Sequence, residues 1–380
     1  MRKPILALLC LMMLIPLTSC TRGQQVENQA YVLIMGIDKN DSGDVILTVQ
    51  TPKVTSAGES ESSSAGGGGE NYLQFSSEGK SFESALEKLE WIVPRQLNLS
   101  HLKLIVFSEE LARDNDCRRL IYDVVHTERL FSAARAVVCA GSAKDFISNT
   151  KAVMGSRLST DIISTFDHYV QQGFVPDSNL AELYYATESV YSDPVAVYAI
   201  AEGKTEPAAP ASALAGDVHA VLRDTQSEIK THYLGSALFS EGVCVGVLEG
   251  TQTMYLNLLN GSLDYFRYEH ENQGLELFPA GSSKVHIDLQ ANPISIKVEI
   301  CLNISAQEVV PDLQGLSEEL ENEILNVIRI AQEMSVEPFG FADAAAKNFA
   351  TLKSWKAYRW QERFAEANVS VGVKLKHTAS

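Results

Sequence analysis

The chain has 380 residues, 45% of them hydrophobic, and its formal net charge at pH 7 is −17. This length and composition are typical of a folded protein with two or three domains, and they exclude a chain that is disordered throughout. The acidic balance argues against binding to nucleic acid and against electrostatic adhesion to anionic lipid, because both depend on clusters of Lys and Arg.

The first twenty residues have the parts of a bacterial lipoprotein signal peptide. Residues 1–3 carry two cations, and the apolar run 4–17 has the length of a signal-peptide core and is short for a bilayer span. Ser19 then precedes Cys20, as in the lipobox, where the cysteine receives a diacylglycerol and becomes the new N-terminus. We predict that residues 1–19 are removed and that Cys20 is lipidated. The alternative is an ordinary secretory peptide with an incidental cysteine.

Lipid at Cys20 is expected to hold the mature chain on the outer face of a membrane, because two acyl chains attach a protein stably. After the signal segment no stretch reaches 18 apolar residues, and the best candidate, 233–248, is interrupted by polar residues. Attachment through lipid is therefore predicted, in place of a membrane-spanning helix.

Strands and helices alternate through residues 20–202, which predicts a mixed α/β N-terminal half. The expected strands are 31–37, 45–51, 102–107, 133–139 and 195–200, and the expected helices are 81–91, 109–112, 117–125, 142–147 and part of 156–190. Residues 203–216 contain two prolines and several alanines, and they are the best candidate for a linker to a second half.

Two segments of the N-terminal half imitate binding motifs. Residues 38–44 resemble the start of an EF-hand loop, but Val49 stands where such a loop needs a bidentate carboxylate, so the segment is interpreted as a hairpin turn. Residues 54–70 are rich in Ser and Gly and are expected to form a flexible loop. The glycines 66–69 lie among Ser and Glu, so a phosphate-binding loop is not predicted.

Residues 217–380 are predicted to form an α+β domain. The expected strands are 285–289, 294–300 and 369–375. Each alternates apolar and polar residues with period two, as in an antiparallel sheet with one buried face. The fold class is therefore α+β and multi-domain, with a mixed α/β N-terminal half followed by a C-terminal antiparallel sheet covered by helices.

The helices expected to cover this sheet are 316–334 and segments within 344–364. The second region carries a run of aromatic side chains, Trp355, Tyr358, Trp360 and Phe364. We interpret these aromatics as residues that lock a helix to the sheet, with a docking surface as the alternative.

Four cysteines remain after the signal peptide and the anchor: Cys117, Cys139, Cys244 and Cys301. They are widely spaced in apolar contexts, which predicts four buried free thiols, with one disulfide of unassigned pairing as the alternative. No Cys/His grouping has zinc spacing, and His270-Glu271 lacks the second histidine of a zinc-protease helix. No metal, cofactor or catalytic residue is therefore predicted, and the chain is expected not to be an enzyme.

Several segments resemble a known family when they are taken together in chain order. They are 36–38, 94–97 with His101, 105–112, 235–239, 245–248, 339–341, Trp355 with Trp360, and the final strand. This ordered set, after a lipobox cysteine, is similar to the Ger(x)C family of spore germination lipoproteins, the C subunits of nutrient germinant receptors.

The resemblance implies a non-enzymatic subunit that is lipid-anchored through Cys20 on the extracytoplasmic face of the spore inner membrane. It implies assembly with two integral-membrane subunits, one of them multi-span and transporter-like, in a complex that senses nutrients and triggers germination. The implied fold has two mixed α/β modules in the N-terminal half and an α+β C-terminal domain. No catalytic, cofactor or metal residue carries over.

Two other functions stay open from sequence. A lipid-anchored solute-binding protein of an importer is expected to have two doubly wound lobes with repeated βα units, whereas the strands near this C-terminus alternate as in antiparallel sheets. An extracytoplasmic hydrolase needs a pocket with converging titratable groups.

Overall fold

The computed structural model describes residues 28–53, 72–128, 130–152, 157–201, 230–270, 273–305 and 312–377. The predicted signal peptide, Cys20, the loop 54–70 and the linker 203–216 lie outside the described residues.

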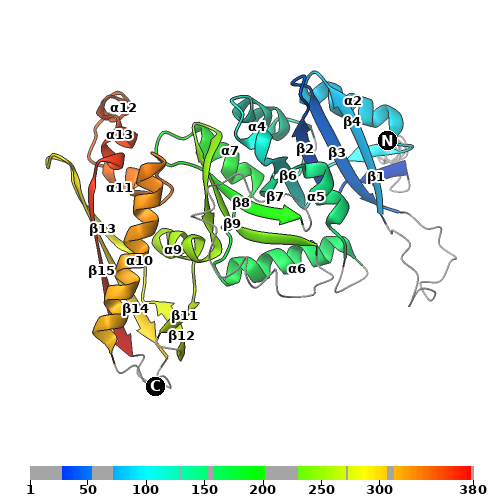
Figure 1. The fold of residues 1–380 in the computed structure, drawn as a ribbon. Coiled ribbons are helices and arrows are strands. Elements are labelled where there is room, and N and C mark those ends of the chain that lie inside the picture. Colours follow the sequence, from blue (N-terminus) through cyan, green and yellow to red (C-terminus); the bar gives the residue numbers. More distant parts are fainter. Residues whose placement is uncertain are drawn as a thin grey trace, which may run out of the picture.

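An eight-stranded sheet forms the larger part of the molecule (Figure 1). Its strands are β2 (Ile34–Lys39), β3 (Val45–Pro52), β4 (Tyr72–Gly79), β6 (Leu104–Ser108), β7 (Arg135–Ala140), β8 (Val195–Ala201), β9 (Thr231–Ser240) and β10 (Val243–Glu249). Their order is β10-β9-β8-β7-β6-β2-β3-β4. The four central strands, β8, β7, β6 and β2, run parallel, and antiparallel strands complete both edges. A short parallel pair, β1 (Gln29–Tyr31) and β5 (Gln96–Asn98), lies beside this sheet.

Helices cover both faces of this sheet. One face packs against α2 (Phe82–Ile92), α3 (Glu109–Ala112), α4 (Cys117–Val125) and α7 (Leu180–Glu188), and the other against α5 (Ala143–Asn149) and α6 (Leu158–Gln171). The parallel strands are continuous apolar runs in the sequence because both of their faces are buried. In β6, Ile105 and Phe107 pack in the core on one face of the sheet, and Leu104 and Val106 pack in the core on the other. The mixed α/β N-terminal half is thus as predicted.

The sheet continues beyond the predicted linker. Strand β9 pairs antiparallel with β8, and β10 pairs with β9, so the first hairpin after residues 203–216 belongs to the N-terminal sheet. The expected boundary between the halves is therefore not a boundary between sheets. The composition of a linker indicates a loop, but it does not say with which strand the next segment pairs.

The second sheet has five strands and lies at the opposite end of the molecule from β1 (Figure 1). They are β11 (Phe266–His270), β12 (Gln273–Pro279), β13 (Lys284–Asp288), β14 (Ser295–Ile304) and β15 (Asn368–His377). Strands β11, β12, β13 and β14 pair with one another antiparallel, as predicted for β13 and β14, whereas β11 and β12 were not expected from the sequence. Strand β15 runs parallel to β14 along its whole length. A wholly antiparallel sheet was therefore the wrong expectation for β15. The helices between β14 and β15 form a crossover connection, and such a connection joins parallel strands.

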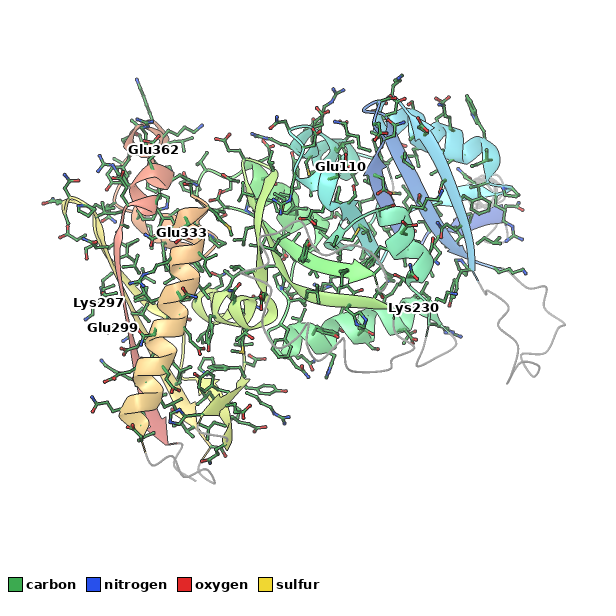
Figure 2. All side chains as sticks on the ribbon, viewed as in Figure 1. Glu110, Lys230, Lys297, Glu299, Glu333 and Glu362 are labelled. Carbon is green, nitrogen blue, oxygen red and sulfur yellow. The ribbon has the colours of Figure 1, made fainter. Side chains whose placement is uncertain are left out.

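The helices of this part share one core with the inner face of the second sheet. They are α9 (Gly250–Asn260), α10 (Leu313–Glu333), α11 (Phe341–Ala346), α12 (Leu352–Tyr358) and α13 (Trp360–Ala365). Helix α9 packs against α10 and against the hairpin of β9 and β10. Helix α10 lies along β15, and its apolar stripe, including Leu320, Ile324 and Ile328, shares a core with the inward residues of β14. The outer face is polar: Lys297 and Glu299 point away from α10 (Figure 2), and their charged atoms are 2.7 Å apart.

The aromatic run near the C-terminus packs inside this part of the molecule. Trp355, Trp360 and Phe364 are buried in the same core as the inner face of the sheet, which confirms the packing interpretation. The indole nitrogen of Trp355 also donates to the carbonyl of Val190, 2.8 Å away, just before β8. The aromatic cluster therefore joins the two parts as well as filling the second core.

A buried carboxyl, Glu337, and a half-buried one, Asp193, complete this junction. Glu337 is completely buried, and its carboxyl oxygens accept from the backbone amides of Phe339, Phe341 and Ala342 at distances of 2.7–3.1 Å. Its own amide donates to Asp193, 2.7 Å away in the segment before β8. Burial raises the pKa of Glu337 to about 8. The three amide hydrogen bonds lower this pKa, and the nearby charge of Asp193 raises it. Burial also raises the pKa of Asp193.

We expect the Glu337 carboxyl to make the stability of this junction depend on pH. Between its unfolded value of about 4.5 and its folded value of about 8, the folded chain holds one proton more than the unfolded chain. The free energy of unfolding should therefore fall as pH rises, by about 1.4 kcal/mol per pH unit from this group. Urea titrations of the wild type and Glu337→Gln from pH 5 to 7.5 should show a shallower slope in the variant.

The matched control is Glu333→Gln, because Glu333 is an exposed glutamate at the end of α10 (Figure 2). This variant should keep the wild-type slope. Equal slopes in Glu337→Gln and the wild type would show that Glu337 is ionised in the folded chain throughout this range.

Candidate functional site

A crevice opens at the carboxyl ends of the central parallel strands. Strand β6 leads directly into α3 on one face of the sheet, and the neighbouring strand β7 leads into α5 on the other face. Ligands of open α/β sheets bind where adjacent connections leave to opposite faces in this way. A hollow of about 630 Å³ lies there, lined by Asp38 and Lys39 of β2, Glu109, Glu110 and Arg113 around α3, and Ser142 and Lys144 around α5.

Asp38 links the end of β2 to the start of α5. Its carboxylate accepts from the amides of Ala143 at 2.7 Å and Lys144 at 2.9 Å. Burial raises the pKa of Asp38, and these amide hydrogen bonds oppose that effect. The first turn of a helix favours a negative charge. The carboxylate of Asp38 therefore occupies the place at the start of α5 that a bound anion would otherwise take.

Gly36 allows this contact by letting α5 lie close to β2. A Cβ atom at position 36 would be 2.6 Å from Cδ1 of Ile147 and 3.1 Å from Cβ of Ala143. The motif Gly36-Ile37-Asp38 thus has two separate physical roles, close approach of the helix and capping of its first turn.

A second buried acid lies on the α3 side of the crevice. Glu109 accepts from the Tyr198 hydroxyl at 2.9 Å and from the Arg113 guanidinium at 2.8 and 3.0 Å. Burial, and then the negative charge of Glu109, raise the pKa of Tyr198 well above its usual value. This cluster ties α3 to β8 across the sheet.

The remaining charges at the crevice are nearer to solvent. The Lys39 ammonium is 2.9 Å from both Asp114 and Asp116, and its hydrogen bonds to these carboxylates raise the pKa of Lys39. Glu110 is exposed near the start of α3 (Figure 2).

Three charged groups of the crevice, Lys39, Glu109 and Arg113, are therefore held in ion pairs. Ser108 and Ser142 accept from backbone amides as helix caps, and no histidine is among the described residues that line it. Within the described ranges, no group of three or more His, Cys, Asp or Glu side chains is placed to hold a metal ion. Such a lining can stabilise the fold or contact a small polar or zwitterionic group.

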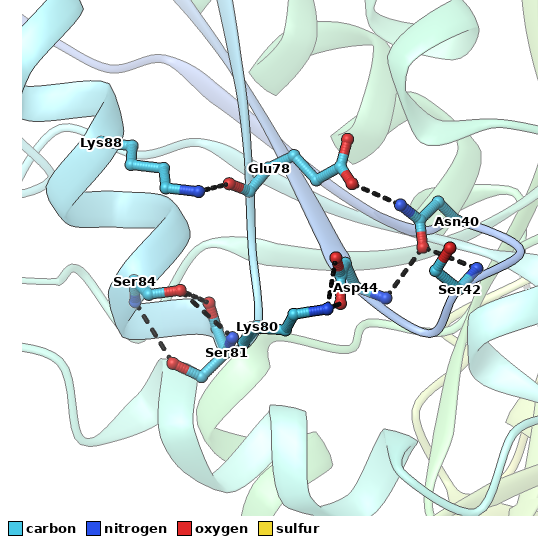
Figure 3. A network of polar contacts seen from close by, with 8 residues as sticks. All are labelled: Asn40, Ser42, Asp44, Glu78, Lys80, Ser81, Ser84 and Lys88. Atoms are coloured by element: carbon cyan, nitrogen blue, oxygen red, sulfur yellow. Dashed lines mark hydrogen bonds and ion pairs between the residues drawn. The ribbon is translucent and has the colours of Figure 1, made fainter.

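The EF-hand-like segment forms the hairpin turn that the sequence predicts (Figure 3). The side-chain oxygen of Asn40 accepts from the amides of Ser42 at 3.0 Å and Asp44 at 2.8 Å. Asp44 in turn pairs with Lys80, and Asn40 donates to Glu78 of β4. These contacts hold the β2–β3 turn against β4, and none of them needs a cation.

The other residues considered from sequence have structural surroundings. Cys117, Cys139 and Cys244 are buried free thiols and Cys301 is a half-buried one. Burial raises the pKa of Cys117 and of Cys244 to about 12, so both thiols stay protonated near neutral pH. His270 is buried, with Nδ1 2.8 Å from Glu319 of α10.

Sequence reasoning missed the roles of Asp38, Glu109 and Tyr198. Asp38 is 105 positions from the first amide that it contacts, and Glu109 is 89 positions from Tyr198. The local signals were a strand that ends in Asp and a Glu directly after the capping Ser108. Neither signal indicates which distant residue the side chain contacts. Cys20, the predicted lipidation site, lies outside the described residues.

Two family models match the chain in succession. The model described as "Spore germination protein N-terminal domain" matches residues 23–200. The model described as "Spore germination B3/GerAC like, C-terminal" matches residues 234–379. The second match begins within β9, so the division between the two family models falls inside the eight-stranded sheet.

Known proteins are similar to nearly the whole chain. Spore germination protein KC of Bacillus subtilis (strain 168) is 22% identical over 379 residues, which cover 96% of this chain and 92% of that protein. The crystal structure of the GerBC protein matches 91% of this chain and 97% of its own, with 12% identity and a TM-score of 0.53. The likeness to that structure shows a shared fold.

We expect Asp38→Asn to destabilise the contact between β2 and α5. An asparagine presents one oxygen and one NH2 group, so it cannot accept from both Ala143 and Lys144 as the carboxylate does. Leaving the buried amide of Ala143 without its acceptor should cost about 1–3 kcal/mol in the free energy of unfolding, measured by urea titration, and loss of the partly buried Lys144 contact should cost less. Asp41→Asn, in the exposed part of the β2–β3 turn, is the control and should change stability little. An equal effect of the two variants would contradict the capping role.

Proposed function

Because the chain belongs to the Ger(x)C, or GerAC-like, family of spore germination proteins, we propose that it is the lipid-anchored extracytoplasmic subunit of a nutrient germinant receptor. The observation that carries this proposal is the match of both family models, in order, over residues 23–200 and 234–379. Cys20 is the proposed lipidation site, and the spore inner membrane is the proposed location. Two integral-membrane subunits, one of them multi-span and transporter-like, are the proposed partners.

The proposed mechanism is scaffolding at the membrane surface. A lipid at Cys20 confines the folded chain near its membrane partners, which raises their effective concentration without strong pairwise affinity. The shared sheet and the aromatic junction support this mechanism, because a scaffold must hold its two parts in one arrangement. None of the described helices is long and apolar enough to span a membrane.

The alternative of a solute-binding protein has less support from the fold. Its two doubly wound lobes would require two similar parallel sheets. The described residues instead form one eight-stranded sheet with a parallel centre and one five-stranded sheet that is mainly antiparallel. The crevice lies at the carboxyl ends of the central strands of the first sheet, and not between two lobes. The hydrolase alternative needs free titratable groups, whereas Glu109, Arg113 and Lys39 of the crevice are paired.

The first test is an affinity purification of the protein from its native membrane in gentle detergent, with mass spectrometry of the proteins that co-purify. We expect two membrane subunits, one of them multi-span and transporter-like. A chain carrying the same tag but lacking the signal segment 1–19 is the control for binding after lysis. Recovery of an ATP-driven importer would contradict the receptor proposal and support the solute-binding alternative.

A second test replaces the proposed anchor by Cys20→Ala. We expect the protein to leave the membrane fraction and nutrient-triggered germination to slow at least about tenfold, because the confinement at the membrane is lost. The urea midpoint of unfolding should stay at the wild-type value. Cys301→Ala, which removes a half-buried thiol elsewhere, should keep both attachment and germination. Full germination by Cys20→Ala spores at normal protein abundance would contradict the scaffolding mechanism.

A further inference from the structure

Three large apolar side chains are exposed together at the end of α2 and the start of β4. Trp91 is 73% exposed, Ile92 is 52% exposed and Leu73 is 43% exposed. We refer to these three residues as the Trp91 patch. The buried stripe of α2 consists of Phe82, Ala85 and Leu89, so Trp91 and Ile92 lie beyond the part of the helix that packs on the sheet.

The Trp91 patch adjoins a hollow of about 300 Å³. Leu73 and the residues that follow Ile92, Val93 and Pro94, line this hollow together with Ala30 of β1. Its lining also includes Lys53 and Arg95. An exposed indole, with an exposed leucine that lines an apolar hollow bearing two cations, is typical of a surface that meets another phase or partner.

The position of β1 limits how far the proposed anchor can be from this patch. The described chain begins at Asn28, and Cys20 precedes it by eight residues. A fully extended chain gains at most about 3.5 Å per residue, so Cys20 lies within about 28 Å of Asn28. Strand β1 follows at once and lines the hollow next to the patch. Lipid on Cys20 would therefore bring the bilayer surface to this end of the molecule.

We propose that the Trp91 patch is the surface by which the protein rests on the lipid bilayer, with the indole of Trp91 in the headgroup region. This inference rests on the proposed anchor at Cys20. Tryptophan favours the membrane interface because its ring is apolar and its N–H remains hydrogen-bonded. Lys53 and Arg95 are placed to meet lipid phosphates, while the net charge of −17 keeps other surfaces away from anionic lipid.

The chain contains three tryptophans, and the other two make Trp91 a specific probe. Trp355 and Trp360 are each only 3% exposed, in the core of the second part. The mature chain, with a histidine tag at its N-terminus, is bound to vesicles of phosphatidylcholine, phosphatidylglycerol and a nickel-chelating lipid. Brominated acyl chains should lower the Trp91 emission, taken as wild type minus Trp91→Phe, about twofold relative to the same vesicles without bromine.

The control places a tryptophan at the opposite end of the molecule. Leu352 is an exposed apolar residue that begins α12, and Figure 1 shows α12 far from α2 and β1. Leu352→Trp in the Trp91→Phe background should give an emission that brominated lipid does not change.

Unchanged Trp91 emission on vesicles to which the protein is bound would overturn the inference, and the patch would then be open to a protein partner. Equal quenching at positions 91 and 352 would overturn it as well, because it would mean that no single face meets the bilayer. The nickel tether replaces the natural lipid, so this result does not depend on lipidation in the cell. Mass spectrometry of the native protein tests lipidation separately, and an unmodified Cys20 would contradict the proposed anchor while leaving the fluorescence result to be judged by itself.

Discussion

The hairpin of β9 and β10 is the constraint on which the arrangement of the molecule depends. Its alternating side chains face two cores: Ala237 and Phe239 lie in the core of the first sheet, and Leu238 and Leu248 lie in the core under α10. At Gly246 a Cβ atom would be 2.2 Å from Sδ of Met334, so the end of α10 packs directly on the hairpin backbone. The β9–β10 hairpin is therefore part of both cores, and one part of the molecule cannot rotate against the other without disrupting the packing of both.

The polar junction strengthens the same connection by a different kind of interaction. Glu337 is buried and Asp193 is half-buried, and each accepts hydrogen bonds from backbone amides: Asp193 from the amide of Glu337, and Glu337 from amides of its own turn. The Trp355 indole adds a directional hydrogen bond to Val190. Apolar contacts at the hairpin bury surface of both parts. These hydrogen bonds specify one position of the two parts relative to each other, because a buried donor or acceptor that loses its partner is costly.

Much of the fold follows from local sequence patterns, and the remainder from pairings that no local pattern contains. The apolar run of β6 and the stripe Leu320, Ile324 and Ile328 of α10 predict buried elements directly. The sheet to which β9 belongs, and the parallel direction of β15, depend on partners far along the chain. The candidate site shows the same limit. Cys20 is predicted as a lipidation site because the pattern of a lipoprotein signal peptide is contiguous in the sequence, but Asp38 acquires its role only when α5 folds onto β2.

The proposed lipid at Cys20 would not orient the protein by itself, because a single point of attachment leaves rotation about that point free. An apolar contact of the Trp91 patch with the bilayer would remove that freedom. Because the β9–β10 hairpin belongs to both cores, the orientation of the first sheet would also fix that of the second. With the Trp91 patch on the bilayer, the outer face of the second sheet lies at the far end of the molecule, in water. That face carries charged pairs such as Lys297 and Glu299. Contacts made there with a partner would be polar, selective and weakened by salt, whereas contacts near the patch would be apolar.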